Sequence, residues 1–104
     1  MGLNINIEVT MPVSVYGANY THNVTPMWKL AGVYEALYMS DKQKAQSLIF
    51  TLSKGIKIMQ DNPDDFIALN PENGWGSYET ALAWLIKLRD KCIEFPEGNI
   101  EISA

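Results

Sequence analysis

The sequence predicts an α+β fold, in which a small antiparallel sheet, made of an N-terminal hairpin and a C-terminal strand, is packed on one face by three to four helices. Apolar and polar residues alternate from Leu3 to Val9, which is the period of a strand with one buried face. Helical spacing of apolar residues follows over most of 27–92, and alternation returns at 100–102. Helices on one face of a small sheet suit this order, and 104 residues predict a single domain, 1–104.

The second strand is less regular than the first. Alternation resumes over 13–16 after Pro12, so we expect a hairpin or a bent, edge-like strand. A glycine and an asparagine within 17–23 indicate a bulge or turn, and this segment is interpreted as the frayed end of the strand. Tyr20 and His22 nevertheless keep the two-residue period, which would place them on one face.

The first helix is expected to start at Thr25 and Pro26. Threonine can accept hydrogen bonds from the free amides, and proline is tolerated at the first helical position because its missing donor would be unpaired there. Apolar spacing predicts that this helix continues through Gly32 to Tyr38.

Three further helices follow. Ser40 and Gln43 have the spacing of a capping box and predict a second helix that ends near Asp61. The segment 62–65, an Asn-Pro start with two aspartates in the first turn, predicts a short third helix. The main core helix is expected over 78–92, capped by the glycine or serine before it.

Composition excludes several classes of function. The net charge is −4, the pI is near 4.8 and the basic residues are scattered singly, so general electrostatic binding of DNA or RNA is not expected. A single cysteine, Cys92, excludes an intramolecular disulfide and a multi-cysteine zinc site. No signal peptide or long apolar run is evident, which predicts a cytoplasmic protein without a membrane partner. No cofactor and no metal are expected.

The densest local signal is the segment 70–79, Asn-Pro-Glu-Asn-Gly-Trp-Gly-Ser-Tyr-Glu. Its glycines permit unusual backbone angles around Trp75, which is aimed either inward as a plug or outward as a platform. The helix start offers free amides to an anion, although Glu79 can occupy them instead. A ligand would stack on Trp75 or Tyr78 and be oriented by polar side chains: Asn70, Asn73 and Ser77.

A second candidate is Thr21-His22-Asn23, where a strand end leads into a helix. A lone histidine is either a hydrogen-bonded structural residue or a general base, but no activated nucleophile can be named beside it and no second metal ligand has suitable spacing. Lys29 could neutralise an anionic ligand. No catalytic residue is therefore assigned.

These two segments, together with Ala31-Gly32-Val33-Tyr34-Glu35-Ala36-Leu37 and the terminal strand, resemble a family of small uncharacterised proteins of bacteria and their phages. The resemblance covers most of the chain from Thr21 onward, and its most specific part is Asn-Gly-Trp-Gly-Ser-Tyr-Glu. It implies that residues 21–23 lie near 75–79. By context it also suggests a binder that sequesters a nucleotide-like signal in host defence.

Three functions compete. The favoured one is a noncatalytic small-molecule binder, with a nucleotide-like ligand at Thr21, His22, Asn23, Lys29, Asn73, Trp75, Ser77, Tyr78 and Glu79. The second is a protein-interaction or homodimerising module that uses its many aromatic residues and the bent hairpin. The third is a hydrolase or transferase with His22 as base, which lacks a nucleophile, a metal set and a cofactor motif.

Overall fold

A computed structural model describes residues 2–10 and 13–104. Three strands, β1 (Gly2–Thr10), β2 (Val13–Thr21) and β3 (Asn99–Ser103), form an antiparallel sheet in the order β2-β1-β3. Five α-helices are described: α1 (Thr25–Ala31), α2 (Tyr34–Tyr38), α3 (Ile49–Asp61), α4 (Pro63–Ile67) and α5 (Tyr78–Glu94). The predicted interruption at Met11-Pro12 lies outside the described residues.

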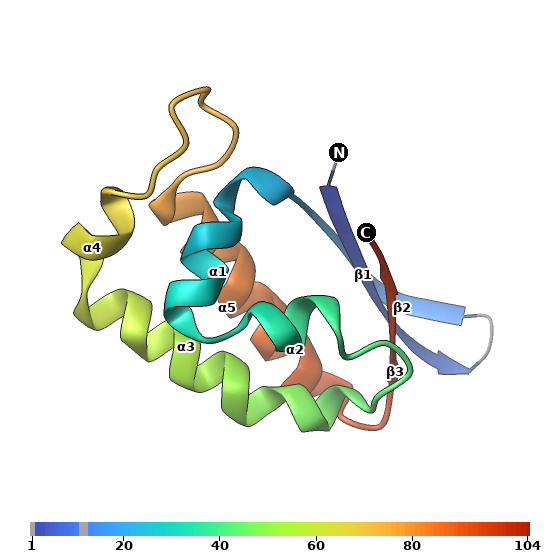
Figure 1. Cartoon of the computed structure of the whole chain (residues 1–104). Coiled ribbons are helices and arrows are strands. Elements are labelled where there is room, and N and C mark those ends of the chain that lie inside the picture. The colour runs from blue at the N-terminus through green and yellow to red at the C-terminus, as the bar shows by residue number, and fades with distance from the viewer. Residues whose placement is uncertain (1, 11–12) are drawn as a thin grey trace.

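The helices lie on one side of the sheet (Figure 1). Three of the four apolar residues that define the two-residue period of β1, Leu3, Ile5 and Ile7, are buried against them, while Asn4 on the other face is exposed. Val9, the fourth, is 45% exposed, because it lies where the pairing with β2 becomes irregular. The core is completed by apolar residues at helical spacing on α3 and α5. The predicted α+β fold is confirmed.

β2 is more regular at its end than the sequence predicts. Pairing with β1 is unbroken from Gly2–Thr21 to Ile7–Tyr16, so the segment before Thr21 is not frayed. The irregularity lies nearer the hairpin tip, where Ser14 pairs with Glu8 and Val15 is left as the extra residue. The expectation of a bulge at Gly17 or Asn19 was wrong, because both residues keep the ladder.

The first predicted helix is in fact two helices. Gly32 has φ +77° and ends α1. The amide of Val33 then donates to the carbonyl of Trp28 at 2.9 Å, which satisfies a carbonyl of the last turn. Because only glycine adopts this conformation at little cost, the helical period alone could not show the break. Leu30, which belongs to the helical spacing of apolar residues that predicted a buried face, is 50% exposed.

Three predicted helix caps were also wrong, for a shared reason. The hydroxyl of Thr25 donates to the carbonyl of His22 at 2.6 Å, and the hydroxyl of Ser40 donates to that of Ala36 at 2.6 Å. The side-chain amide of Asn62 likewise donates to an upstream carbonyl. These groups satisfy carbonyls of the preceding turn instead of amides of the next helix.

The remaining helix ends agree better with the sequence. A 3₁₀ turn (Ala45–Leu48) precedes α3, which ends at Asp61 as predicted. Ser77 caps α5 as predicted, accepting a hydrogen bond from the amide of Thr80 at 3.3 Å. The start of α5 is therefore fixed by its own serine.

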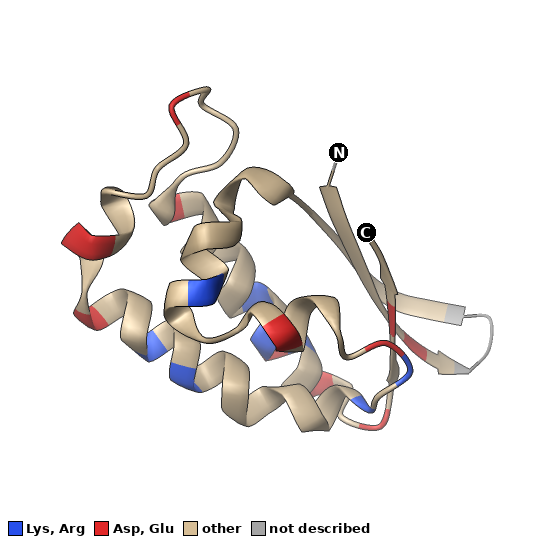
Figure 2. Cartoon of the chain, viewed as in Figure 1, with Lys and Arg blue, Asp and Glu red and all other residues tan. Residues whose placement is uncertain are grey.

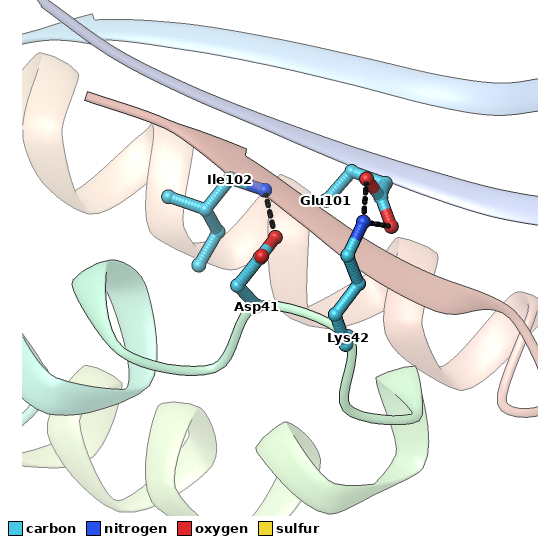
Figure 3. Close-up of polar contacts among 4 residues, drawn as sticks. All are labelled: Asp41, Lys42, Glu101 and Ile102. Atoms are coloured by element: carbon cyan, nitrogen blue, oxygen red, sulfur yellow. Dashed lines mark hydrogen bonds and ion pairs between the residues drawn. The ribbon is translucent and has the colours of Figure 1, made fainter.

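The two edges of the sheet are treated differently. Residues 41–45, here called the strap, run along the outer edge of β3. The amide of Lys42 donates to the carbonyl of Ile100 at 2.7 Å, and the amide of Ile100 donates to the carbonyl of Gln43 at 2.8 Å. The Asp41 carboxylate accepts from the amide of Ile102 at 2.8 Å, beside an ion pair of Lys42 with Glu101 (Figure 3). β3 is thus covered, whereas β2 has no partner on its outer edge among the described residues.

Candidate functional site

The segment between α4 and α5 projects beyond the helices, at the end of the molecule where β1 begins (Figure 1). Side-chain amides hold both of its ends. The side-chain Oδ1 of Asn70 accepts a hydrogen bond from the backbone amide of Tyr78 at 2.8 Å, and Oδ1 of Asn73 accepts one from the backbone amide of Trp75 at 2.9 Å. The turn at Asn73 is the local hydrogen bond that this residue type favours. The backbone on both sides of Trp75 is therefore tied by side-chain hydrogen bonds.

Gly76 brings this segment against the end of β2. It has φ +95°, and a Cβ at this position would lie 2.8 Å from Val24 Cγ1 and 3.0 Å from Thr21 Cγ2. No side chain fits in that space without displacing its neighbours. The close approach therefore depends on glycine for both conformation and room.

An open cleft of about 680 Å³ lies where these elements meet. We call it the Trp75 cleft. It is lined by Gly2 of β1, by the end of β2, by the 74–76 turn and by the first turn of α5: Gly2, Asn19, Tyr20, Thr21, Gly74, Trp75, Gly76 and Thr80. Its volume is in the range typical of small-molecule sites.

Trp75 is the prominent wall of this cleft. Its side chain is 64% exposed, so of the two orientations left open by the sequence the structure shows the outward one. An exposed indole held by a rigid turn offers a flat apolar face to solvent at little further cost in conformational entropy.

Tyr20 connects the cleft to the core. Its hydroxyl hydrogen-bonds with the hydroxyl of Thr80 and accepts from the amide of Ser77 at 3.3 Å. Its ring packs on Trp28 and Trp84, with centroids 6.0 and 5.6 Å away. The indole N–H of Trp84 is buried and has no hydrogen-bond partner among the described residues. The aromatic cluster positions Tyr20, whose hydroxyl binds the first turn of α5 in addition to the cap by Ser77.

The cleft is uncharged. None of the described residues that line it is acidic or basic, and Figure 2 shows no basic position on the segment between α4 and α5 or along the part of β2 that it colours. The nearest charges along the chain are those of Glu72 and Glu79, both exposed. The site therefore provides neutral hydrogen-bonding groups without a counter-charge for an anion.

Tyr78 is placed differently from the sequence-based expectation. It is 9% exposed, its hydroxyl donates to the carbonyl of Met59 at 2.7 Å, and its ring stacks on Phe66. Its face is therefore not available to a ligand, and the expectation that it forms a stacking surface was wrong. Glu79 lies in the first turn of α5 but makes no hydrogen bond there, because Ser77 and Asn70 already bind the free amides.

The structure brings only one residue of the 21–23 group into the cleft. Thr21 lines it, and the side chain of Asn23 donates back to the Thr21 hydroxyl at 2.8 Å. His22 turns away: its Nδ1 hydrogen-bonds with the hydroxyl of Tyr38 at 2.7 Å. Lys29 lies over the ring of Tyr34, 5.2 Å from its centroid, and does not line the cleft.

Of the predicted site residues, only Thr21 and Trp75 line the cleft. Gly74 and Gly76 stand in the predicted segment but were not assigned to the site, and four lining residues outside that segment were missed: Gly2, Asn19, Tyr20 and Thr80. They are far from the 70–79 segment along the chain, except for Thr80, which follows it directly. The regular period of β2 carried the relevant signal, since a strand that continues to Thr21 places Tyr20 on the helix side.

Neither a metal nor thiol chemistry is indicated by the described residues. They hold no group of three histidine, cysteine, aspartate or glutamate side chains that could bind a metal ion. Cys92 is buried, and burial raises the pKa of its thiol to about 11. At neutral pH this thiol is therefore protonated and a poor nucleophile.

Comparison of the chain with protein-family models, curated proteins and solved structures found no match. The resemblance to a bacterial and phage family therefore stays a prediction. Among the helices of the described residues, none has the length and apolar character needed to cross a membrane.

Proposed function

We propose that this protein is a noncatalytic binder of a small, planar, polar molecule, which stacks on Trp75. The observation that carries the proposal is that a 64% exposed indole is held in place over a cleft of about 680 Å³. Neutral polar side chains of Asn19, Thr21 and Thr80 line the same cleft and can orient a ligand.

The lack of charged side chains among the described residues that line the cleft limits the kind of ligand that it can bind. A nucleotide phosphate placed inside it would meet no basic residue, and Lys29 is held elsewhere by Tyr34. A buried anion without a counter-charge is costly. The proposal is therefore for a neutral ring system, such as a nucleoside or a nucleobase, with any phosphate directed toward solvent.

A thermal-shift panel of nucleobases, nucleosides, nucleotides and amino-acid derivatives tests this function. A ligand that binds only the native state raises the midpoint of unfolding. We expect nucleosides to raise it at least as much as their phosphates, and Trp75→Ala to abolish the rise. Ile93→Ala, at a similarly exposed apolar residue on α5, is the matched control and should retain it. No shift with any compound, or an unchanged shift in Trp75→Ala, contradicts the proposal.

A second candidate function, self-association, is favoured by the uncovered edge of β2. The run from Val9 to Trp28 contains no lysine, arginine, aspartate or glutamate, so this edge lacks the charges that usually prevent strand pairing. Antiparallel pairing of β2 with a second copy would extend the sheet across a two-fold axis.

Light scattering at high concentration tests self-association. If β2 edges pair, Ser14→Lys should return the protein to a monomer, whereas Ser103→Lys on the strapped side should not. Both serines are exposed, so neither change should perturb the core. A monomeric wild-type protein rules out this second function. Catalysis with His22 as base remains a prediction without support from the geometry, because His22 does not line the Trp75 cleft and its Nδ1 is directed to the hydroxyl of Tyr38.

A further inference from the structure

We propose that the groove between α1 and α3 docks an acidic amphipathic helical segment of another protein. This groove has a volume of about 270 Å³ and shares no lining residue with the Trp75 cleft. We call it the Phe50 groove. It is lined by residues of the two helices and of the turn between α1 and α2: Leu30, Ala31, Gly32, Phe50, Thr51, Lys54 and Ile58.

Large apolar side chains are exposed along this groove. Phe50 is 77% exposed, the highest value among the large hydrophobic residues described, and Leu30 is 50% exposed. Met39, which lines a neighbouring depression that also includes Gly32, is 65% exposed. Neighbouring apolar side chains of this size on a surface are typical of a contact with another protein.

The backbone keeps the groove open. Gly32 ends α1 at φ +77°, and no atom lies within 4 Å of the position that its Cβ would occupy. On α3, Phe50, Lys54 and Ile58 are four residues apart and follow one face of the helix. A straight face beside an open turn suits a helix laid along α3, since such partners use apolar anchors at three- and four-residue spacing.

Charge indicates which partner fits. Lys54 is the one charged residue among those lining the groove. Lys29 precedes Leu30 on α1 but lines the adjoining depression, together with Glu35. Neither lysine has an ion-pair partner among the described residues, whereas Lys42, Lys57 and Lys91 do. Figure 2 shows basic positions on both α1 and α3, in a chain of net charge −4.

A second copy of this chain does not suit the groove. Pairing two such grooves across a two-fold axis would bring lysines together and supply no acidic residue from the lining of either copy. An apolar helix flanked by aspartate or glutamate would instead fill the Phe50 groove and pair with Lys54. Glu35 lines the two depressions next to the groove. Because its carboxylate would repel an acidic side chain, we expect the acidic residues of the partner to lie on the Lys54 side of the groove.

A selection from a randomised helical-peptide library displayed on yeast, against the full chain, tests this proposal. Enriched peptides should combine apolar residues at positions i, i+4 and i+7 with flanking acidic residues, and their affinity should fall as salt is added. Phe50→Ser should weaken a selected peptide by about tenfold or more, because exposed aromatic anchors dominate such contacts. Lys54→Glu should weaken it several-fold.

Two matched variants control for general effects of the substitutions. Ile93→Ser removes an exposed apolar side chain on α5, and Lys87→Glu reverses an exposed lysine there, and neither should change binding. Circular dichroism verifies that each variant is folded, and Phe50→Leu replaces Phe50→Ser should the latter unfold. The proposal is overturned if no acidic amphipathic peptide is enriched, or if the enriched peptides bind the Phe50 variant as tightly as the wild type.

Discussion

At the scale of single residues, two aromatic side chains three positions apart have opposite roles. Trp75 is exposed and packs on little, whereas Tyr78 is buried, donates to Met59 and stacks on Phe66. The sequence places both beside glycines or a helix start and does not distinguish them. The exposed fractions in the structure do distinguish them, because Tyr78 belongs to the core and Trp75 is open to solvent.

This contrast predicts different effects of two substitutions. Tyr78→Phe removes a buried hydrogen bond and should lower the free energy of unfolding by about 1–2 kcal/mol while leaving ligand binding intact. Trp75→Ala should change stability by less than about 0.5 kcal/mol, as surface substitutions do, and abolish binding. Urea unfolding and the ligand panel measure the two effects. A large loss of stability in Trp75→Ala would show that the indole is part of the core.

Cys92 predicts how stability depends on pH. Burial raises the pKa of its thiol from 9.0 to about 11, so between these values the unfolded chain loses the proton and the native state keeps it. The contribution is fully present below pH 9 and is lost as the pH rises through 11. Burial also raises the pKa of Tyr16 and of Tyr38, which act in the same direction.

Cys92→Ala separates the thiol from the tyrosines. Between pH 8 and pH 10.5 the urea midpoint should decrease more for the wild type than for Cys92→Ala, since only the wild type has to retain a buried proton on sulfur. In the native state at pH 8 the thiol should also react slowly with a maleimide. Equal losses in the two proteins, or rapid labelling without denaturant, would show that Cys92 is accessible.

At the scale of elements, the strap contains one residue with a strained backbone conformation, Lys42. Lys42 has φ +69°, the only positive value among the described non-glycine residues, while its amide and its ammonium group both bind β3. The ion pair is largely exposed on the lysine side and contributes little, whereas a left-handed residue other than glycine costs about 1–2 kcal/mol.

Lys42→Gly should therefore be about 1 kcal/mol more stable than Lys42→Ala. Both variants lose the ion pair with Glu101, so it does not contribute to their difference in free energy of unfolding. That difference is the strain relieved by glycine, less the extra backbone entropy that glycine loses on folding. Equal stability of the two variants would mean that the strap relaxes to another conformation once the lysine is removed.

The packing of α3 against the turn after α1 also depends on one glycine. A Cβ on Gly55 would lie 2.3 Å from Val33 Cγ1 and 3.1 Å from the carbonyl oxygen of Ala31. Alanine favours a helix interior by about 1 kcal/mol, but overpacking at this distance costs about 1–3 kcal/mol.

We therefore expect Gly55→Ala to destabilise the protein, and Val33→Ala to recover part of the loss in the double variant. Gln60→Ala, at an exposed residue of the same helix, is the control and should be close to neutral. A more stable Gly55→Ala variant would show that helix propensity outweighs the contact and that α1 and α3 are less closely packed than described.

At the scale of the whole molecule, periodicity predicts the elements better than their ends. The alternation of Leu3 to Val9 and the stripe of α3 were sufficient for the fold class, because burial of one face is a local property of sequence. The break at Gly32 and the strap were not predictable in this way. In both cases the backbone satisfies its hydrogen bonds through partners that the helical pattern does not specify.

Of the residues around the candidate site, the sequence predicted mainly those of the 70–79 segment and missed most of those on the strands. Asn73, Trp75 and Ser77 stand in a dense local signal, and the structure places them at or beside one cleft. Tyr20 could not be assigned to it from chain order, because its position depends on a sheet register and on a ring cluster with Trp28 and Trp84. The position of Tyr20 is set by contacts between residues far apart in the chain, which a sequence pattern does not show.

The central claim is that the Trp75 cleft binds a neutral planar ligand, and a nuclear magnetic resonance titration tests it most directly. The three tryptophan indole N–H signals, assigned by single substitutions, serve as reporters during addition of a nucleoside. The account predicts that the Trp75 signal and the amides of Thr21 and Thr80 shift together with saturation, while the buried indole of Trp28 shifts little. Saturable shifts confined to other residues, or none at all across the ligand panel, would contradict it.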